Sequence, residues 1–181
     1  MKRQRLCSQW TWPCLYLMEP DVYSENNFCV DAKAWGKKAM AFAVRAHNHL
    51  WGKNNEAPLA FLHLKGLHLN FISKMYLGWN KFGHHRPCDG WGLSGKGSFF
   101  IPPGIVFPYI LEKKVTGIFI MSMESPDAES IIPGSFKGPL VLGSGNCNTR
   151  EAAGILEGLK IFQENPDMFS DVSCKTALEP V

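Results

Sequence analysis

The sequence predicts a fold of the α+β class, with short helices first, an antiparallel hairpin or small sheet next and one helix near the end. Apolar residues recur at helical spacing after Asp31, change to short runs rich in β-formers after residue 98, and return to helical spacing after residue 149. The 181 residues, of which 45% are hydrophobic, suffice for one ordinary core. We expect an irregular leader at residues 1–30, a main unit at 31–145 and a short C-terminal segment at 146–181.

The predicted helices of the main unit precede its strands. Asp31 is a favourable N-cap residue, and the apolar positions that follow it indicate a helix that ends near Gly52. Two shorter helices fit residues 58–65 and 70–77, each followed by a glycine. Residues 79–97 are dense in Gly, Pro, His and Trp, which indicates a structured loop.

Strand patterns begin after this loop. A strand fits residues 99–101, and residues 104–110 and 115–121 fit the two arms of a hairpin. Pro108 within the first arm predicts an edge strand or a bulge at that point. Short strands also fit residues 131–132 and 140–142, and a helix capped by Thr149 fits residues 149–163.

Charge is distributed unevenly along the chain, although the formal net charge is only +3. Residues 33–114 hold twelve Lys or Arg against three acidic residues and carry +9, whereas residues 115–181 carry −5. A basic block of this kind suits a polyanion-binding surface, and it also suits an ordinary solvated surface.

The cysteines and the apolar runs indicate a cytoplasmic protein. The six cysteines form no C-x-x-C pair and no common zinc spacing, so we expect reduced thiols. The basic and apolar stretch near the N-terminus is broken by Pro13 and Pro20 and precedes no small-residue cleavage site, unlike a signal peptide. No run approaches the roughly 20 apolar residues that span a bilayer, so no membrane partner is expected.

Three stretches occur in an order typical of one enzyme family. Residues 57–80 read APLAFLHLKGLHLNFISKMYLGWN, with Lys-Gly-Leu and Leu-Gly-Trp turns; residues 97–120 read GSFFIPPGIVFPYILEKKVTGIFI; and residues 131–143 read IIPGSFKGPLVLG. Together they resemble the first part of the catalytic core of bacterial-type DNA primases, particularly the short forms carried by phages and integrating elements. The loop RPCDGWGL at residues 86–93 is also similar to the mobile-element relatives.

This resemblance implies a function and a division of the chain. Residues 31–145 would correspond to the N-terminal subdomain of the primase core, and residues 146–181 to a truncated or degenerate start of a Toprim fold, the module that holds the catalytic metals. The implied protein is primase-like and engages single-stranded DNA or an RNA/DNA hybrid during replication of a mobile element, with a helicase or another replication protein as a possible partner. Its expected nucleic-acid-binding residues are Lys65, Lys74, Lys81, Arg86 and Lys137.

The chain departs from the family where chemistry is expected. Gly104 stands where the family has an Arg at the start of the Phe-Pro strand. The sequence ILEG at residues 155–158 resembles the start of the Toprim fold and nominates Glu157 as acid/base catalyst, while its helical spacing favours a solvent-facing helix residue. No Asp-x-Asp exists to bind metal. We therefore expect no cofactor in this chain, with Mg²⁺ or Mn²⁺ only at a complete Toprim site, and no catalysis by this chain alone.

Two other groups of basic residues have alternative interpretations. Lys38, Arg45 and His49 fall on one flank of the predicted first helix, where we favour a solvated surface over phosphate contacts. His84 and His85 precede Arg86 and fit either phosphate contact or solvation. The alternative functions are accordingly a non-catalytic module that binds nucleic acid or a replication partner, and an unrelated small α+β binding protein.

Overall fold

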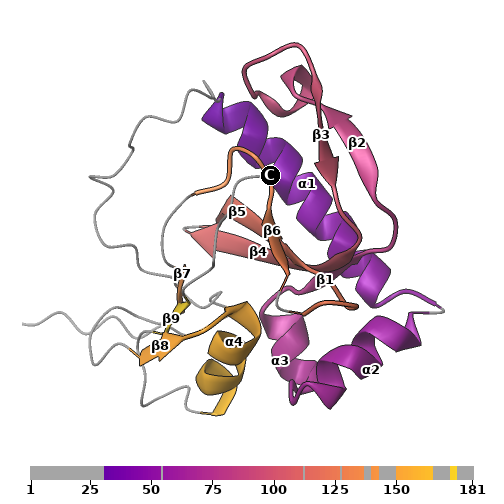
Figure 1. Ribbon diagram of the computed structural model, residues 1–181, viewed down its shortest axis with the longest axis vertical. Coiled ribbons are helices and arrows are strands. Elements are labelled where there is room, and N and C mark those ends of the chain that lie inside the picture. The colour runs from indigo at the N-terminus through magenta and orange to yellow at the C-terminus, as the bar shows by residue number, and fades with distance from the viewer. Residues whose placement is uncertain are drawn as a thin grey trace, which may run out of the picture.

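The centre of the fold is an antiparallel sheet with strand order β1-β4-β5-β6 (Figure 1). These strands are β1 (Gly78–Asn80), β4 (Gly104–Leu111), β5 (Lys114–Met121) and β6 (Glu129–Ile131). Helices cover both faces of this sheet, so the chain has the predicted α+β architecture. The computed structural model describes residues 31–53, 55–111, 113–126, 128–136, 140–142, 150–164 and 172–174, and the predicted leader lies outside them.

One face of the sheet is covered by α1 (Ala32–Leu50) (Figure 1). Asp31 caps this helix as predicted, because its carboxylate accepts hydrogen bonds from the backbone N–H groups of Lys33 and Ala34 at 3.1 and 3.0 Å. The indole N–H of Trp35 donates to the carbonyl of Pro133 at 2.8 Å and fixes the rotation of the helix over the sheet. The buried apolar contacts at this face join Trp35, Ala39, Phe42, Ala43 and Ala46 to Val106, Ile118 and Ile120.

The opposite face is covered by α2 (Glu56–Leu64), α3 (Leu69–Lys74) and α4 (Ile155–Glu164). The first two match the predicted short helices within a few residues at each end. The side-chain amide of Gln163 joins α4 to the turn between them: it donates to the carbonyl of Gly66 at 2.9 Å and accepts from the backbone N–H of His68 at 2.7 Å. The core on this side includes Leu62, Leu67, Ile72, Phe107, Tyr109, Phe119, Ile155 and Leu159.

The predicted hairpin is confirmed, since β4 and β5 pair antiparallel with Phe107 opposite Phe119. The register shifts between Tyr109 and Ile110, directly after Pro108. β1 pairs only with residues 104–106, so β4 has no described neighbour on that side at Pro108. The locally unpaired edge therefore accommodates the missing N–H of Pro108, because Ile118, its partner on β5, bonds instead to Ser135 and Ile132.

The prediction of a structured loop at residues 79–97 is wrong for the parts of this segment that form regular elements. Part of it completes β1, and the rest contains β2 (His84–Pro87) and the 3-10 helix η1 (Asp89–Trp91). β2 pairs antiparallel with β3 (Ser98–Ile101), the strand that was predicted at residues 99–101. β1 pairs with β4, which lies far along the chain, and β2 pairs with β3 across η1. Short-range sequence periodicity therefore gives little indication of β1 and β2.

The C-terminal helix begins later than the sequence predicts. Residues 150–152 form β8 (Arg150–Ala152) instead of helix, which excludes a helix that starts after Thr149. β8 pairs parallel with β9 (Val172–Cys174), which also pairs with β7 (Leu140–Leu142), the strand predicted there. Long-range strand pairing thus overrides the local helical pattern. β6 begins and ends slightly before the strand predicted at residues 131–132.

Candidate functional site

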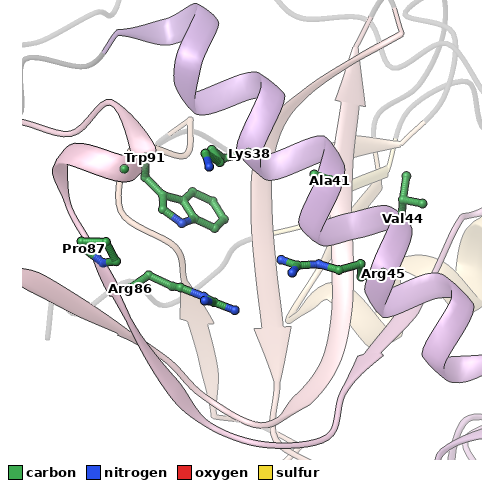
Figure 2. Close-up of a pocket in the computed structure, with 8 residues that line it drawn as sticks. Lys38, Ala41, Val44, Arg45, Arg86, Pro87 and Trp91 are labelled. Atoms are coloured by element: carbon green, nitrogen blue, oxygen red, sulfur yellow. The ribbon is translucent and has the colours of Figure 1, made fainter.

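A groove of about 550 Å³ lies between the outer side of α1 and the segment that holds β2 and η1 (Figure 2). Three of its lining residues are basic and none is acidic. Its walls are Lys38, Ala41, Val44 and Arg45 on α1 and Arg86, Pro87, Gly90 and Trp91 opposite.

Helix geometry places two cations in one wall of the groove. Lys38 and Arg45 are seven residues apart, which is two turns, so they fall on the same side of α1. Ala39, Phe42 and Ala46 occupy the other side and are buried against the sheet. The outer side of α1 is therefore free to line the groove, and both of its basic residues are exposed.

Strand geometry places the third cation in the opposite wall. Arg86 belongs to β2 and pairs with Phe99 of β3. His84, two residues earlier and hence on the same side of the strand, has its ring centroid 6.3 Å from that of Phe42 on α1. This side of β2 consequently faces α1, and Arg86 points into the groove (Figure 2). His85, the residue between His84 and Arg86, lies on the opposite side of the strand.

Trp91 forms the buried end of the groove, with only 4% of its surface exposed. Its indole packs edge-on against the rings of Trp35, Phe42 and Phe99, with centroids 6.4, 6.2 and 5.4 Å apart. A backbone hydrogen bond of 2.7 Å from Asp31 to the carbonyl of Gly92 ties η1 to the start of α1. The two walls are thus held at a fixed separation by the hydrophobic core.

All charged side chains that line the groove are positive. The guanidinium groups of Arg45 and Arg86 point toward one another across it (Figure 2), and no acidic group among the described residues pairs with them or with Lys38. Arg86 is also half-buried. The nearby Asp89 is exposed, and its carboxylate accepts a hydrogen bond from the backbone N–H of Gly90 at 2.6 Å. Facing cations without a counter-ion favour an anionic ligand.

The groove brings together residues from two separate groups of the sequence. Lys38 and Arg45 contribute to it, although their pattern favours a solvated surface when the helix is considered alone. Arg86 is the one described member of the expected nucleic-acid-binding set that lines the groove. His49, which the sequence groups with Lys38 and Arg45, does not line it. Trp91 was not nominated from the sequence, and its only signal there is its place in the loop that begins at Arg86.

The other described members of the expected binding set do not join the groove. Lys65 ends α2, with its amine 5.7 Å from the ring centroid of Phe61. Lys74 is exposed in the last turn of α3, and Lys81 is exposed just after β1. Lys137 lies outside the described residues. The structure therefore distributes this set over several surfaces.

Glu157 lies in the first turn of α4 and is exposed, as its helical spacing predicts. Its carboxylate accepts a hydrogen bond of 2.7 Å from the backbone N–H of Ala153, which satisfies a donor at the start of the helix. No cluster of three or more His, Cys, Asp or Glu side chains suited to a metal ion occurs in the part of the chain that the structure describes. In this environment Glu157 acts as a capping residue of α4.

No family model, curated protein or solved structure matches this chain. The function must therefore be argued from the site itself. Among the described helices, none is long and apolar enough to cross a membrane.

Proposed function

We propose that this chain binds nucleic acid and holds the phosphate backbone in the groove between α1 and β2. The observation that carries the proposal is the pair of facing guanidinium groups on Arg45 and Arg86, with Lys38 in the same groove and no acidic partner among the residues that the structure describes. Guanidinium groups donate in a planar fork that matches phosphate oxygens, and an anion between them offsets their mutual repulsion.

A polyanion fits this surface better than a single small anion. α1 contains no acidic residue between Ala32 and Leu50, so no carboxylate on this helix repels phosphates that pass the groove. All lining residues of the groove belong to the basic block at residues 33–114, which carries +9. Repeated cations along a surface bind a chain of phosphates because each contact releases condensed counter-ions.

The wider role that we propose is that of a primase-like protein in the replication of a mobile element, binding single-stranded DNA or an RNA/DNA hybrid. The order of α2, α3 and the β4–β5 hairpin supports this proposal, because the same order carries the sequence resemblance. Primer synthesis by this chain alone is not part of the proposal, since the sequence lacks an Asp-x-Asp pair. A helicase or another replication protein would be its partner.

Binding of a fluorescent single-stranded oligonucleotide, measured by anisotropy across a salt series, tests the proposal. We expect weak, salt-sensitive binding in which the three groove cations contribute about −2 to the slope of log K against log salt. Arg45→Gln and Arg86→Gln should each make the slope shallower by about 0.7. Binding that is absent at low salt, or unchanged between low and physiological salt, would exclude nucleic acid as the ligand.

A further inference from the structure

Exposed aromatic rings lie on and next to the β2–β3 hairpin, and strand alternation places Phe100 and His85 on the side away from the groove. Phe100 is 49% exposed and Phe82, at the entry to the hairpin, is 69% exposed. His85 is the cross-strand partner of Phe100, and their ring centroids are 5.1 Å apart. We call the rings of Phe82, His85 and Phe100, together with Lys81, the aromatic surface.

The absence of a side chain at Gly83 makes room for the Phe100 ring. A Cβ atom at residue 83 would lie 2.4 Å from Cζ of the Phe100 ring, so only glycine lets this ring lie against the chain there. The ring therefore lies against the Gly83 backbone and beside the ring of His85, and the Phe100 residue as a whole is 49% exposed. A ring held in this way can stack a ligand at little cost in side-chain entropy.

A cation accompanies the exposed rings. The amine of Lys81 lies 5.1 Å from the ring centroid of Phe82 and 5.9 Å from that of Trp79. No acidic residue occurs between Trp79 and Cys88. The aromatic surface thus combines π-faces with positive charge, which suits nucleobases joined by phosphates better than a purely apolar partner.

We infer that the aromatic surface is a base-stacking platform, and hence that the ligand of this chain is a single-stranded nucleic acid. This inference rests on the proposed function and specifies its ligand. His85 and Arg86 are adjacent on β2, so their side chains lie on opposite sides of one strand. A strand of nucleic acid that passes this edge places a phosphate against Arg86 and a base against His85 and Phe100. Paired bases in a duplex keep their faces stacked on one another and would not reach these rings.

The test compares two labelled oligonucleotides of equal length, one of thymidines and one of abasic sites, which share the phosphate backbone and differ only in the bases. Phe100→Ala and Phe82→Ala should each weaken binding to the thymidine oligonucleotide about tenfold and leave binding to the abasic one unchanged. Phe100→Trp should retain wild-type affinity, and Phe100→Leu should not. Leu64→Ala is the matched control, because Leu64 is 85% exposed on α2, away from the hairpin.

The outcomes separate this inference from the proposed function. If the wild-type chain binds neither oligonucleotide in a salt-sensitive way, the proposed function itself fails. If it binds both equally and the phenylalanine variants bind as the wild type does, the groove stands and the stacking platform is excluded. Equal affinity for duplex and single strands also excludes the platform. If the variants instead lower the mass of an oligomer in analytical ultracentrifugation without changing oligonucleotide affinity, the aromatic surface is a contact between protein chains.

Discussion

Arg45 and Arg86 direct their guanidinium groups toward one another across the groove, one from the outer side of α1 and the other from β2 (Figure 2). The ring contacts of Trp91 with Phe42 of α1 and with Phe99 of β3, the strand that pairs with β2, hold this arrangement in place. Because the repulsion between the two cations is part of the folded state without ligand, multivalent anions should stabilise the protein by binding between them.

The first prediction concerns this anion effect on stability. Phosphate should raise the melting temperature of the wild-type protein more than chloride does at equal ionic strength, and the increment should fall in Arg45→Gln and Arg86→Gln. Without multivalent anions at low salt, each variant should gain roughly 0.2–0.5 kcal/mol in its free energy of unfolding, because one of the facing charges is removed. Thermal unfolding followed by circular dichroism measures both effects. Equal phosphate increments in all three proteins would contradict an anion site here.

The second prediction compares two neighbouring lysines of α1. Lys38 lines the groove and Lys37 does not, although both are exposed. Lys38→Gln should weaken oligonucleotide binding and make its salt dependence shallower, whereas Lys37→Gln should change affinity less than twofold. Anisotropy titrations at two salt concentrations measure this difference. Equal losses in the two variants would show that the ligand senses only the overall charge of the helix.

The third prediction concerns the contact of α1 with β1. A Cβ atom on Gly78 would lie 2.6 Å from the carbonyl carbon of Ala46 and 2.7 Å from the backbone nitrogen of His47, so Gly78→Ala must separate the two elements. We expect it to lower the free energy of unfolding by about 1–3 kcal/mol. Gly36→Ala, a substitution on α1 itself, is the matched control. Its Cβ meets nothing closer than 3.9 Å, so it should stabilise the protein by about 0.5–1 kcal/mol. Urea denaturation should give opposite signs for the pair.

Elements specified by neighbouring residues could be predicted from the sequence. The cap at Asp31, the short helices α2 and α3 and the β4–β5 hairpin follow from local periodicity and turn chemistry. By contrast, β2 and β8 have little local signal, because each exists through pairing with a strand beyond an intervening segment. For the same reason, the replacement of helix by strand at residues 150–152 could not be foreseen from apolar spacing.

The candidate site was only partly predictable. Helical spacing places Lys38 and Arg45 on one side of α1, and the basic loop nominates Arg86. Their convergence depends on how the β2–β3 hairpin packs on α1, through contacts such as Phe42 with His84. The sequence alone contains no measure of that packing, so a solvated surface was the simpler interpretation of the helix.

The fourth prediction concerns Glu129, which joins β6 to the start of α4. Its carboxylate accepts a hydrogen bond of 3.0 Å from the backbone N–H of Ile155, and Ile155 is buried. Glu129→Ala should lower the free energy of unfolding by about 1.5–3 kcal/mol, since it removes a charged acceptor from a partly buried donor. Urea denaturation measures this loss. The exposed Glu124 offers the control, and Glu124→Ala should change stability by less than about 0.5 kcal/mol.

The last prediction separates the two interpretations of Glu157. As a capping residue, it stabilises the first turn of α4 by accepting from the N–H of Ala153. Glu157→Gln keeps a carbonyl oxygen for this bond and should change stability by less than about 0.5 kcal/mol, whereas Glu157→Ala removes the acceptor and should cost about 1 kcal/mol. Thermal and urea unfolding of both variants measure the difference.

The same variants decide whether Glu157 acts in catalysis. A template-dependent assay of oligoribonucleotide synthesis with Mg²⁺ or Mn²⁺ should give the same signal for the wild type and Glu157→Gln, because the carboxylate is bound to a backbone donor and no suitable metal cluster occurs among the described residues. An acid/base catalyst behaves differently: its amide variant loses metal-dependent synthesis while its unfolding curve stays unchanged. That combination would assign Glu157 to the chemistry, and stability loss in Glu157→Ala without any change in synthesis assigns it to the helix.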